Sequence, residues 1–170
     1  MDSAKLRLVN AMKGNFMKGQ ATVVYDPARP GLKTRNTGWA VANVKGGHDI
    51  HRYYEYWIKK IINPLDIQVQ GSLKKYPFVN VCQPSWGTHI SLVRGEFIKP
   101  HLRNLWKKYA GKTFDFEYDL DAHEVTSGYN KDDQGSFWVT DVKSDDLMNI
   151  RAELGLKTDW PLHMTVARIW

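Results

Sequence analysis

The sequence predicts a single α+β domain, spanning residues 1–170, that consists of two similar lobes. Three observations lead to this prediction. The length of 170 residues and the 42% content of hydrophobic residues are typical of one globular domain with its own core. The hydrophobic patterns place strands and helices in both halves of the chain. A short motif with one histidine also occurs in each half.

The first half of the chain has the patterns of several strands around one amphipathic helix. Residues 21–26 are β-branched and aromatic, and the loop that follows is rich in proline, glycine and basic residues. Apolar side chains recur on one helical face over residues 48–62, and an Asn-Pro pair ends this pattern. Strands are expected at residues 21–26, 38–44, 66–70, 78–83 and 88–95.

The second half is predicted to contain two helices, a hairpin and a final strand. Pro100 and Gly111 mark the ends of a helix at residues 99–111. Ser144 is expected to cap a second helix at residues 144–155. An acidic stretch alternates with a period of two, which predicts a strand that pairs with the next one across a turn. These strands are expected at residues 112–128 and 136–142, and the last strand at residues 161–169.

Two four-residue motifs share the order histidine, apolar residue, hydroxyl residue, apolar residue. They are HISL, which begins at His89, and HMTV, which begins at His163. Side chains at positions i and i+2 of a strand lie on the same face. We therefore expect His89 to lie beside Ser91, and His163 to lie beside Thr165.

The other face of these two strands is expected to belong to the core. An arginine follows each histidine by five positions, at Arg94 and Arg168. Both arginines have the parity of the core-facing residues, although their position near a strand end offers a way to solvent. Neither arginine is assigned to the site. The residues expected in the core are Ile90, Leu92, Met164 and Val166.

If the two strands lie side by side or face each other, two imidazoles and two hydroxyls meet in one volume. One neutral imidazole can then accept the proton of an attacking hydroxyl or water, and a protonated one can donate to the leaving oxygen. Hydroxyl and backbone N–H groups can hold the phosphate oxygens. The alternative is that both histidines are buried, hydrogen-bonded core residues. Either motif alone favours that alternative, whereas the pair favours phosphodiester chemistry.

The paired motifs resemble the signature of the two-histidine (2H) phosphoesterase superfamily, and the resemblance spans most of the chain. It implies two pseudo-symmetric lobes of antiparallel sheet, with helices outside and a central cleft. It also implies cleavage of phosphodiester bonds without a metal ion. The substrates implied are RNA ends, 2′,3′-cyclic phosphates, and 2′-5′ or cyclic oligonucleotides.

A narrower resemblance is to the phage anti-CBASS nuclease family. It is carried by KTRNTGWAV, which begins at Lys33, and by PSWGTHISLVRGE, which begins at Pro84. It implies degradation of the cyclic di- and trinucleotide messengers of bacterial immunity. In this sequence Ser91 stands where threonine is usual. By this resemblance the catalytic residues are His89, Ser91, His163 and Thr165.

The mechanism implied begins with a ribose 2′-hydroxyl that one histidine activates. The hydroxyl attacks the adjacent phosphorus, and the other histidine protonates the departing 5′-oxygen. The sequence leaves open which histidine is the base. Two other functions also stay open: an RNA-end, 2′-5′ or 2′,3′-cyclic phosphodiesterase of the same superfamily, and a non-catalytic nucleotide- or RNA-binding module.

Four further residues are candidates for binding the nucleotide. A base stacked on an aromatic ring is worth ~1–3 kcal/mol, and a basic side chain can contact phosphate. For each aromatic residue the alternative is a place in the core, and for the lysine it is a solvated loop. The candidates are Tyr25, Lys33, Trp39 and Trp86.

The charge of the chain is unevenly distributed. Residues 1–112 hold 19 Lys/Arg and 6 Asp/Glu, a balance of +13, whereas residues 113–170 hold 5 and 12, a balance of −7, which together give the net +6. The basic part is expected either to attract nucleotide phosphates or to attract the acidic part of the same chain. Charge alone does not decide between the two.

The expected partner is a small cyclic or short oligonucleotide, with no membrane and no obligate protein partner. Since Cys82 is the only cysteine, no internal disulfide and no cysteine metal site are expected. No metal and no cofactor are assigned. His123 and Glu124 point apart on an alternating strand, so no joint role is assigned to them. The expected location is the cytoplasm, that of the host cell if a phage encodes the protein.

Overall fold

The computed structural model describes residues 15–29, 36–62, 80–126 and 136–169. An antiparallel sheet dominates this part of the chain and a few helices accompany it, so the α+β prediction is confirmed. In chain order the elements are β1 (Phe16–Tyr25), β2 (Trp39–Val44), α2 (Gly47–Ile62), β3 (Val81–Cys82), β4 (His89–Arg94), the 3₁₀-helix η1 (Pro100–Leu105), β5 (Thr113–Thr126), β6 (Ser136–Lys143), α4 (Asp145–Glu153) and β7 (Leu162–Ile169).

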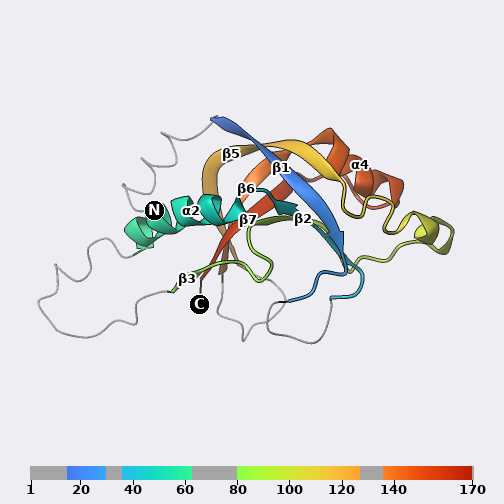
Figure 1. Cartoon of the computed structure of the whole chain (residues 1–170), viewed down its shortest axis with the longest axis horizontal. Helices are drawn as coiled ribbons and strands as arrows, with labels where there is room; N and C mark the ends of the chain where they lie inside the picture. Colours follow the sequence, from blue (N-terminus) through green and yellow to red (C-terminus); the bar gives the residue numbers. More distant parts are fainter. Residues whose placement is uncertain (1–14, 30–35, 63–79, 127–135, 170) are drawn as a thin grey trace, which may run out of the picture.

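Within the described residues, seven strands form one sheet in the order β3-β7-β4-β2-β1-β5-β6. A further pairing between β7 and β6 joins the two sides of this order, so six strands close into a barrel and β3 lies beside β7. The long strand β5 makes closure possible because it pairs first with β1 and then with β6. Its register shifts between Tyr118 and Ala122, and β1 and β5 arch over the other strands in Figure 1.

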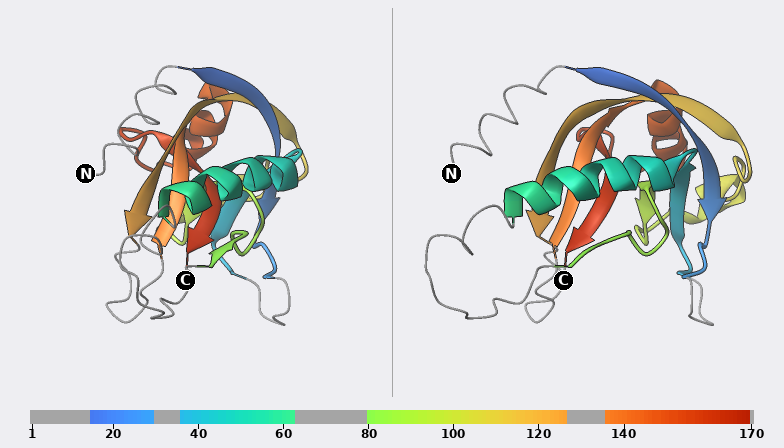
Figure 2. Two further views of the ribbon diagram at one scale, coloured as in Figure 1. Left: turned by 90° about the vertical axis from the view of Figure 1, so that its left-hand side faces the viewer. Right: turned by 60° about the vertical axis from the view of Figure 1, so that its left-hand side comes forward.

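The core lies between the helices and one face of the sheet. Alternate strand residues such as Ala21 and Val23 pack in one cluster with Ile58 of α2 and Ile150 of α4. Figure 2 shows α2 lying across β6 and β7, and α4 behind the arch of β1 and β5. The other face of each strand therefore points away from the helices.

Several predicted elements are confirmed with small changes of boundary. The helix expected at residues 48–62 is α2. The helix expected at residues 144–155 is α4, and the hydroxyl of Ser144 caps it by accepting a hydrogen bond of 3.3 Å from the backbone N–H of Leu147. The strands that carry the two histidine motifs are β4 and β7.

Other predictions were wrong or fall elsewhere. The segment at residues 99–111, which was expected to form a helix, forms the 3₁₀-helix η1 followed by turns. No residue of η1 is buried in the core, and Lys107 adopts a positive φ of 70°, so an α-helix is not continued here. The first strand begins at Phe16 rather than at residue 21, since pairing with β5 extends it through exposed residues. The strand expected at 66–70 lies outside the described residues, and of the strand at 78–83 the described part forms β3.

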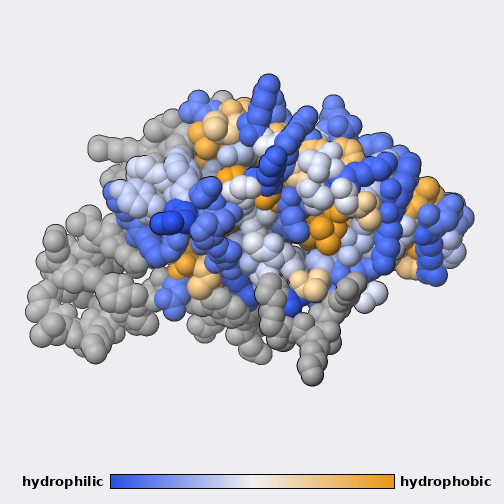
Figure 3. All heavy atoms as spheres, in the orientation of Figure 1, coloured by the Kyte–Doolittle hydropathy of each residue, from blue (hydrophilic) through white to orange (hydrophobic). Residues whose placement is uncertain are grey.

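The coloured part of the face shown in Figure 3 is mostly hydrophilic, and the hydrophobic residues on it occur in small separate groups. None of the helices in the described part of the chain has the length and apolar character needed to cross a membrane.

Candidate active site

The two histidine motifs lie on neighbouring strands. β4 pairs with β7 in antiparallel register, with His89 opposite Thr165 and Ile90 opposite Met164. The same register, continued by one residue, sets Ser91 opposite His163. Because residues opposite one another in a sheet share a face, both histidines and both hydroxyl residues lie on one face.

This shared face is the one that points away from the helices. The apolar residues between the site residues lie in the core cluster, as the sequence predicts: Ile90, Leu92, Met164 and Val166. His89 and Ser91 are nevertheless buried, with 5% and 7% of their surface exposed. His163 and Thr165 are partly exposed. The site therefore runs from a buried side at β4 to an open side at β7.

His89 is held in one orientation by the turn before β4. Gly87, at a φ of +70°, forms that turn, and its carbonyl oxygen lies 2.7 Å from Nδ1 of His89. A carbonyl oxygen only accepts, so Nδ1 carries the proton and Nε2 has a free lone pair. Burial lowers the pKa of His89 to about 4, and the charge of Arg94 acts in the same direction. His89 is therefore a neutral imidazole near pH 7.

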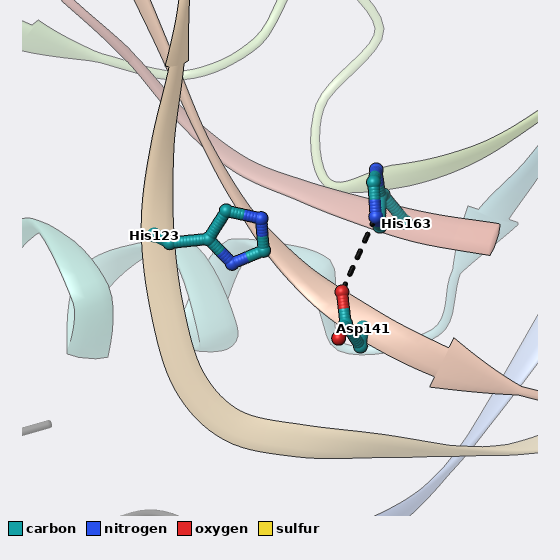
Figure 4. A group of neighbouring side chains, drawn as sticks. All are labelled: His123, Asp141 and His163. Carbon is teal, nitrogen blue, oxygen red and sulfur yellow. Dashed lines mark ion pairs between the residues drawn. The ribbon is translucent and has the colours of Figure 1, made fainter. Parts of the chain in front are cut away.

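His163 has a different environment, formed by side chains of β5 and β6. Its Nε2 lies 3.2 Å from Oδ1 of Asp141, and its ring lies 5.7 Å from that of His123 (Figure 4). Burial lowers the pKa of His163, and the Asp141 carboxylate opposes this shift. Asp141 therefore favours the protonated form of His163. Among the residues that the structure describes, no carboxylate has this effect on His89.

The last residue of each motif forms a β-bulge, which corrects the expectation for the two arginines. In β4 the residues opposite Val41 and Ala40 are Ser91 and Val93, so Leu92 is one extra residue. In β7 the register shifts in the same way after Thr165, with Val166 as the extra residue. An extra residue reverses the parity of all that follow. Arg94 and Arg168 therefore lie on the face of the histidines rather than on the core face.

The effect of Arg94 on the pKa values of the two histidines agrees with its placement on their face. Its positive charge lowers the pKa of both His89 and His163, and its guanidinium lies over the ring of Trp160, 5.6 Å from the ring centre. The equal spacing of the two arginines was the feature of the sequence that could have revealed them. Simple alternation of strand side chains excluded them, because it allows for no bulge.

The carbonyl of each bulge residue is bound by a buried side chain from a helix. The Arg151 guanidinium of α4 donates to the carbonyl of Leu92. Nδ1 of His51 in α2 lies 2.8 Å from the carbonyl of Val166. A bulge leaves a backbone group outside the strand ladder, and here each helix satisfies it. The two motifs thus share a bulge, a re-oriented arginine and a helix contact.

Two of the predicted nucleotide-binding residues lie beside His89. The Trp86 ring is 5.2 Å from the ring of His89, and the Trp39 ring is 5.5 Å from that of Trp86. Trp39 is opposite Arg94 in the β2–β4 pairing and so shares its face. Both tryptophans are partly exposed and close enough to the site to contact a bound base.

Tyr25 does not belong to this group, which corrects its prediction as a nucleotide-binding residue. It lies in the core cluster, 8% exposed, with its ring 4.8 Å from that of Trp106. It stands opposite Ala40, on the core side of the sheet. Lys33, the fourth candidate, lies outside the described residues.

Comparison with models of protein families, with curated proteins and with solved structures finds no match to this chain.

Proposed function

We propose that this protein is a phosphodiesterase that cleaves small oligonucleotides with two histidines, one as general base and one as general acid. The observation that carries the proposal is the pairing of β4 with β7, which sets both motifs on one face of the sheet. Cleavage of a phosphodiester needs one group that accepts a proton, one that donates a proton, and donors to the phosphate oxygens. The two motifs place such groups beside one another, and neither proton transfer requires a metal ion.

The repetition around the two motifs supports a 2H-like architecture of two related lobes. Each half contributes a strand with a histidine and a hydroxyl residue, a bulge and an arginine, and the helix of each half binds the bulge carbonyl of the other half. Such agreement in detail goes beyond the four residues of each motif.

His89 is the general base of this proposal and His163 the general acid. The proton on Nδ1 of His89 is fixed by Gly87, so Nε2 is free to accept the proton of the attacking hydroxyl. His163 is supported by Asp141, whose carboxylate stabilises the imidazolium. Asp141 acts through His163 and is a positioning residue.

The phosphate and the bases have their own contacts on the same face. Ser91 and Thr165 can donate their hydroxyl protons to non-bridging oxygens, and the two arginines of the bulges bring positive charge to the developing dianion. Trp39 and Trp86 offer flat surfaces to a base at the β4 side.

The substrate class that we propose is a 3′-5′ linked cyclic di- or trinucleotide of the kind that serves bacterial immunity. The ribose 2′-oxygen forms a bond to phosphorus as the bond from phosphorus to the 5′-oxygen breaks. The proton of the 2′-hydroxyl passes to His89, and His163 gives a proton to the 5′-oxygen. The first product carries a 2′,3′-cyclic phosphate, and counteracting such an immune signal is the role that follows.

The pH dependence of kcat/KM should follow from these two roles. His89 must be neutral, which holds above a pKa of about 4. His163 must be protonated, and its pKa lies below the ordinary value of about 6.5. We expect a bell-shaped profile whose maximum lies below pH ~6.5 and whose alkaline limb falls about tenfold per pH unit. A profile that rises from pH 6 to pH 8 would contradict these roles.

The test of the function is a substrate panel in EDTA, analysed by chromatography. It contains cyclic dinucleotides, cyclic trinucleotides, 2′-5′ oligoadenylate and RNA ending in a 2′,3′-cyclic phosphate. We expect turnover of a cyclic oligonucleotide, and none of its 2′-deoxy analogue, because the analogue lacks the nucleophile. Cleavage of the linear substrates alone would indicate an RNA-end enzyme, and binding without turnover of any substrate would indicate a binding module.

A further inference from the structure

Three potential metal ligands from neighbouring strands converge beside the candidate active site. His123 comes from β5, Asp141 from β6 and His163 from β7 (Figure 4). One ligand atom of each side chain lies within 4.8 Å of the other two. The residues are far apart in the sequence, and it is the closure of the barrel through β6 and β7 that brings them together.

We propose that these three side chains bind one divalent transition-metal ion, with Zn²⁺ as the best-suited ion. Bonds of ~2.0–2.1 Å at tetrahedral angles set two ligand atoms about 3.3 Å apart. The Nε2 of His163 and Oδ1 of Asp141 already lie 3.2 Å apart. His123 is exposed, so its ring can move the remaining short distance without disturbing the core.

The chemistry of the ligands selects the class of ion. Two imidazoles and one carboxylate suit Zn²⁺, Co²⁺ or Fe²⁺, whereas Mg²⁺ and Ca²⁺ prefer oxygen ligands only. Three protein ligands leave at least one coordination position for water or a substrate oxygen. The site is therefore an open one on the exposed side of the sheet.

A metal ion here would compete with the proposed acid, and this consequence rests on the proposed function. The ion binds the Nε2 lone pair of His163, and the Asp141 carboxylate binds the ion instead of the imidazolium. His163 can then no longer carry the second proton that a general acid donates. Zn²⁺ should therefore inhibit the phosphodiesterase reversibly, and EDTA should restore it.

The direct test needs no substrate. Chelator-treated protein is titrated with Co²⁺ at pH 7, and the visible absorption of the protein-bound ion is followed. We expect one ion per chain, and an affinity at least tenfold lower in His123→Ala and in Asp141→Asn. His101→Ala, which removes an exposed histidine of η1, should bind as the unaltered protein does. No binding below millimolar Co²⁺, or equal binding by His123→Ala, would overturn the site.

The second arm measures cleavage of the best panel substrate with and without Zn²⁺. The unaltered protein should lose most of its activity in Zn²⁺, whereas His123→Ala should keep its EDTA activity and resist inhibition. If Co²⁺ binds and no substrate is cleaved, the metal site stands and the proposed function fails. If cleavage occurs and Co²⁺ does not bind, the proposed function stands and the metal site fails.

Discussion

Replacing His89 with alanine should lower kcat by about 10³-fold, within the usual range for loss of a general base. The ring is buried beside Trp86, and its Nδ1 is bound to the Gly87 carbonyl, so alanine removes the Nε2 atom that accepts the proton in the proposed mechanism. Affinity for the 2′-deoxy substrate analogue should change by less than about threefold, because the base acts in the transition state. Steady-state kinetics in EDTA and calorimetric binding of the analogue measure the two effects.

Removal of a buried ring can also destabilise the protein, so a second variant is needed. In His89→Gln the side-chain amide can still donate to Gly87, but it cannot accept a proton near pH 7. We expect the same loss of kcat with a smaller change in melting temperature. His48→Ala is the matched control, since His48 is an exposed histidine of α2 bound to the side chain of Gln83. Retention of more than a tenth of kcat by His89→Gln would exclude His89 as the base.

The strands that carry the two motifs could be predicted from the sequence because they depend on local patterns, whereas the sequence left open whether these strands pair side by side or face each other. Alternation of apolar and polar residues identifies β4 and β7, and the repeated histidine motif indicates that they belong to one site. The same alternation places Tyr25 on the core face, although its aromatic ring and its place beside the basic loop made it a candidate for base stacking.

The bulges were not predictable because they exist only relative to a partner strand. Leu92 is an extra residue with respect to β2, and Val166 with respect to β6, and neither partner is adjacent in the sequence to the strand that bulges. Alternation therefore assigned Arg94 and Arg168 to the wrong face. His123 was missed for a related reason, since closure of the barrel brings its ring to 5.7 Å from the ring of His163, whereas the sequence shows it only beside Glu124.

The carbonyl of the bulge in β4 is bound by the buried Arg151, which also pairs with the partly exposed Glu96, and Arg151 leads to the largest stability effect that we expect. Arg151 is 1% exposed, and its guanidinium binds the Leu92 carbonyl, the Lys157 carbonyl and both carboxylate oxygens of Glu96. It also lies over the ring of Trp160, 4.4 Å from the ring centre. Each of its partners loses a donor if the side chain is removed.

Arg151→Met should therefore lower the free energy of unfolding by about 3–5 kcal/mol, as measured by urea denaturation at pH 7. Arg151→Lys should lower the free energy of unfolding by a smaller amount, since lysine keeps the positive charge. Some stability is still lost, because lysine lacks the planar guanidinium that binds two oxygens of Glu96. Arg52→Met, at an exposed position of α2, is the control and should change stability by less than about 0.5 kcal/mol. A loss below about 1 kcal/mol in Arg151→Met would show that the ion pair does not hold this end of β4.

The pH dependence of the same variant separates the ion pair from packing. Burial opposes ionisation of Glu96, but the hydrogen bonds from Arg151 and from the Arg94 backbone outweigh it and hold the pKa of this carboxyl below its usual value. A lowered pKa in the folded state stabilises the protein above the unfolded pKa of about 4.3, and this contribution is lost as the pH falls through the folded value. The difference in stability between the unaltered protein and Arg151→Met should therefore shrink below pH ~4. If the difference stays constant down to pH 3, the stability lost with Arg151 comes from its packing against Trp160 and its carbonyl contacts rather than from its pairing with Glu96.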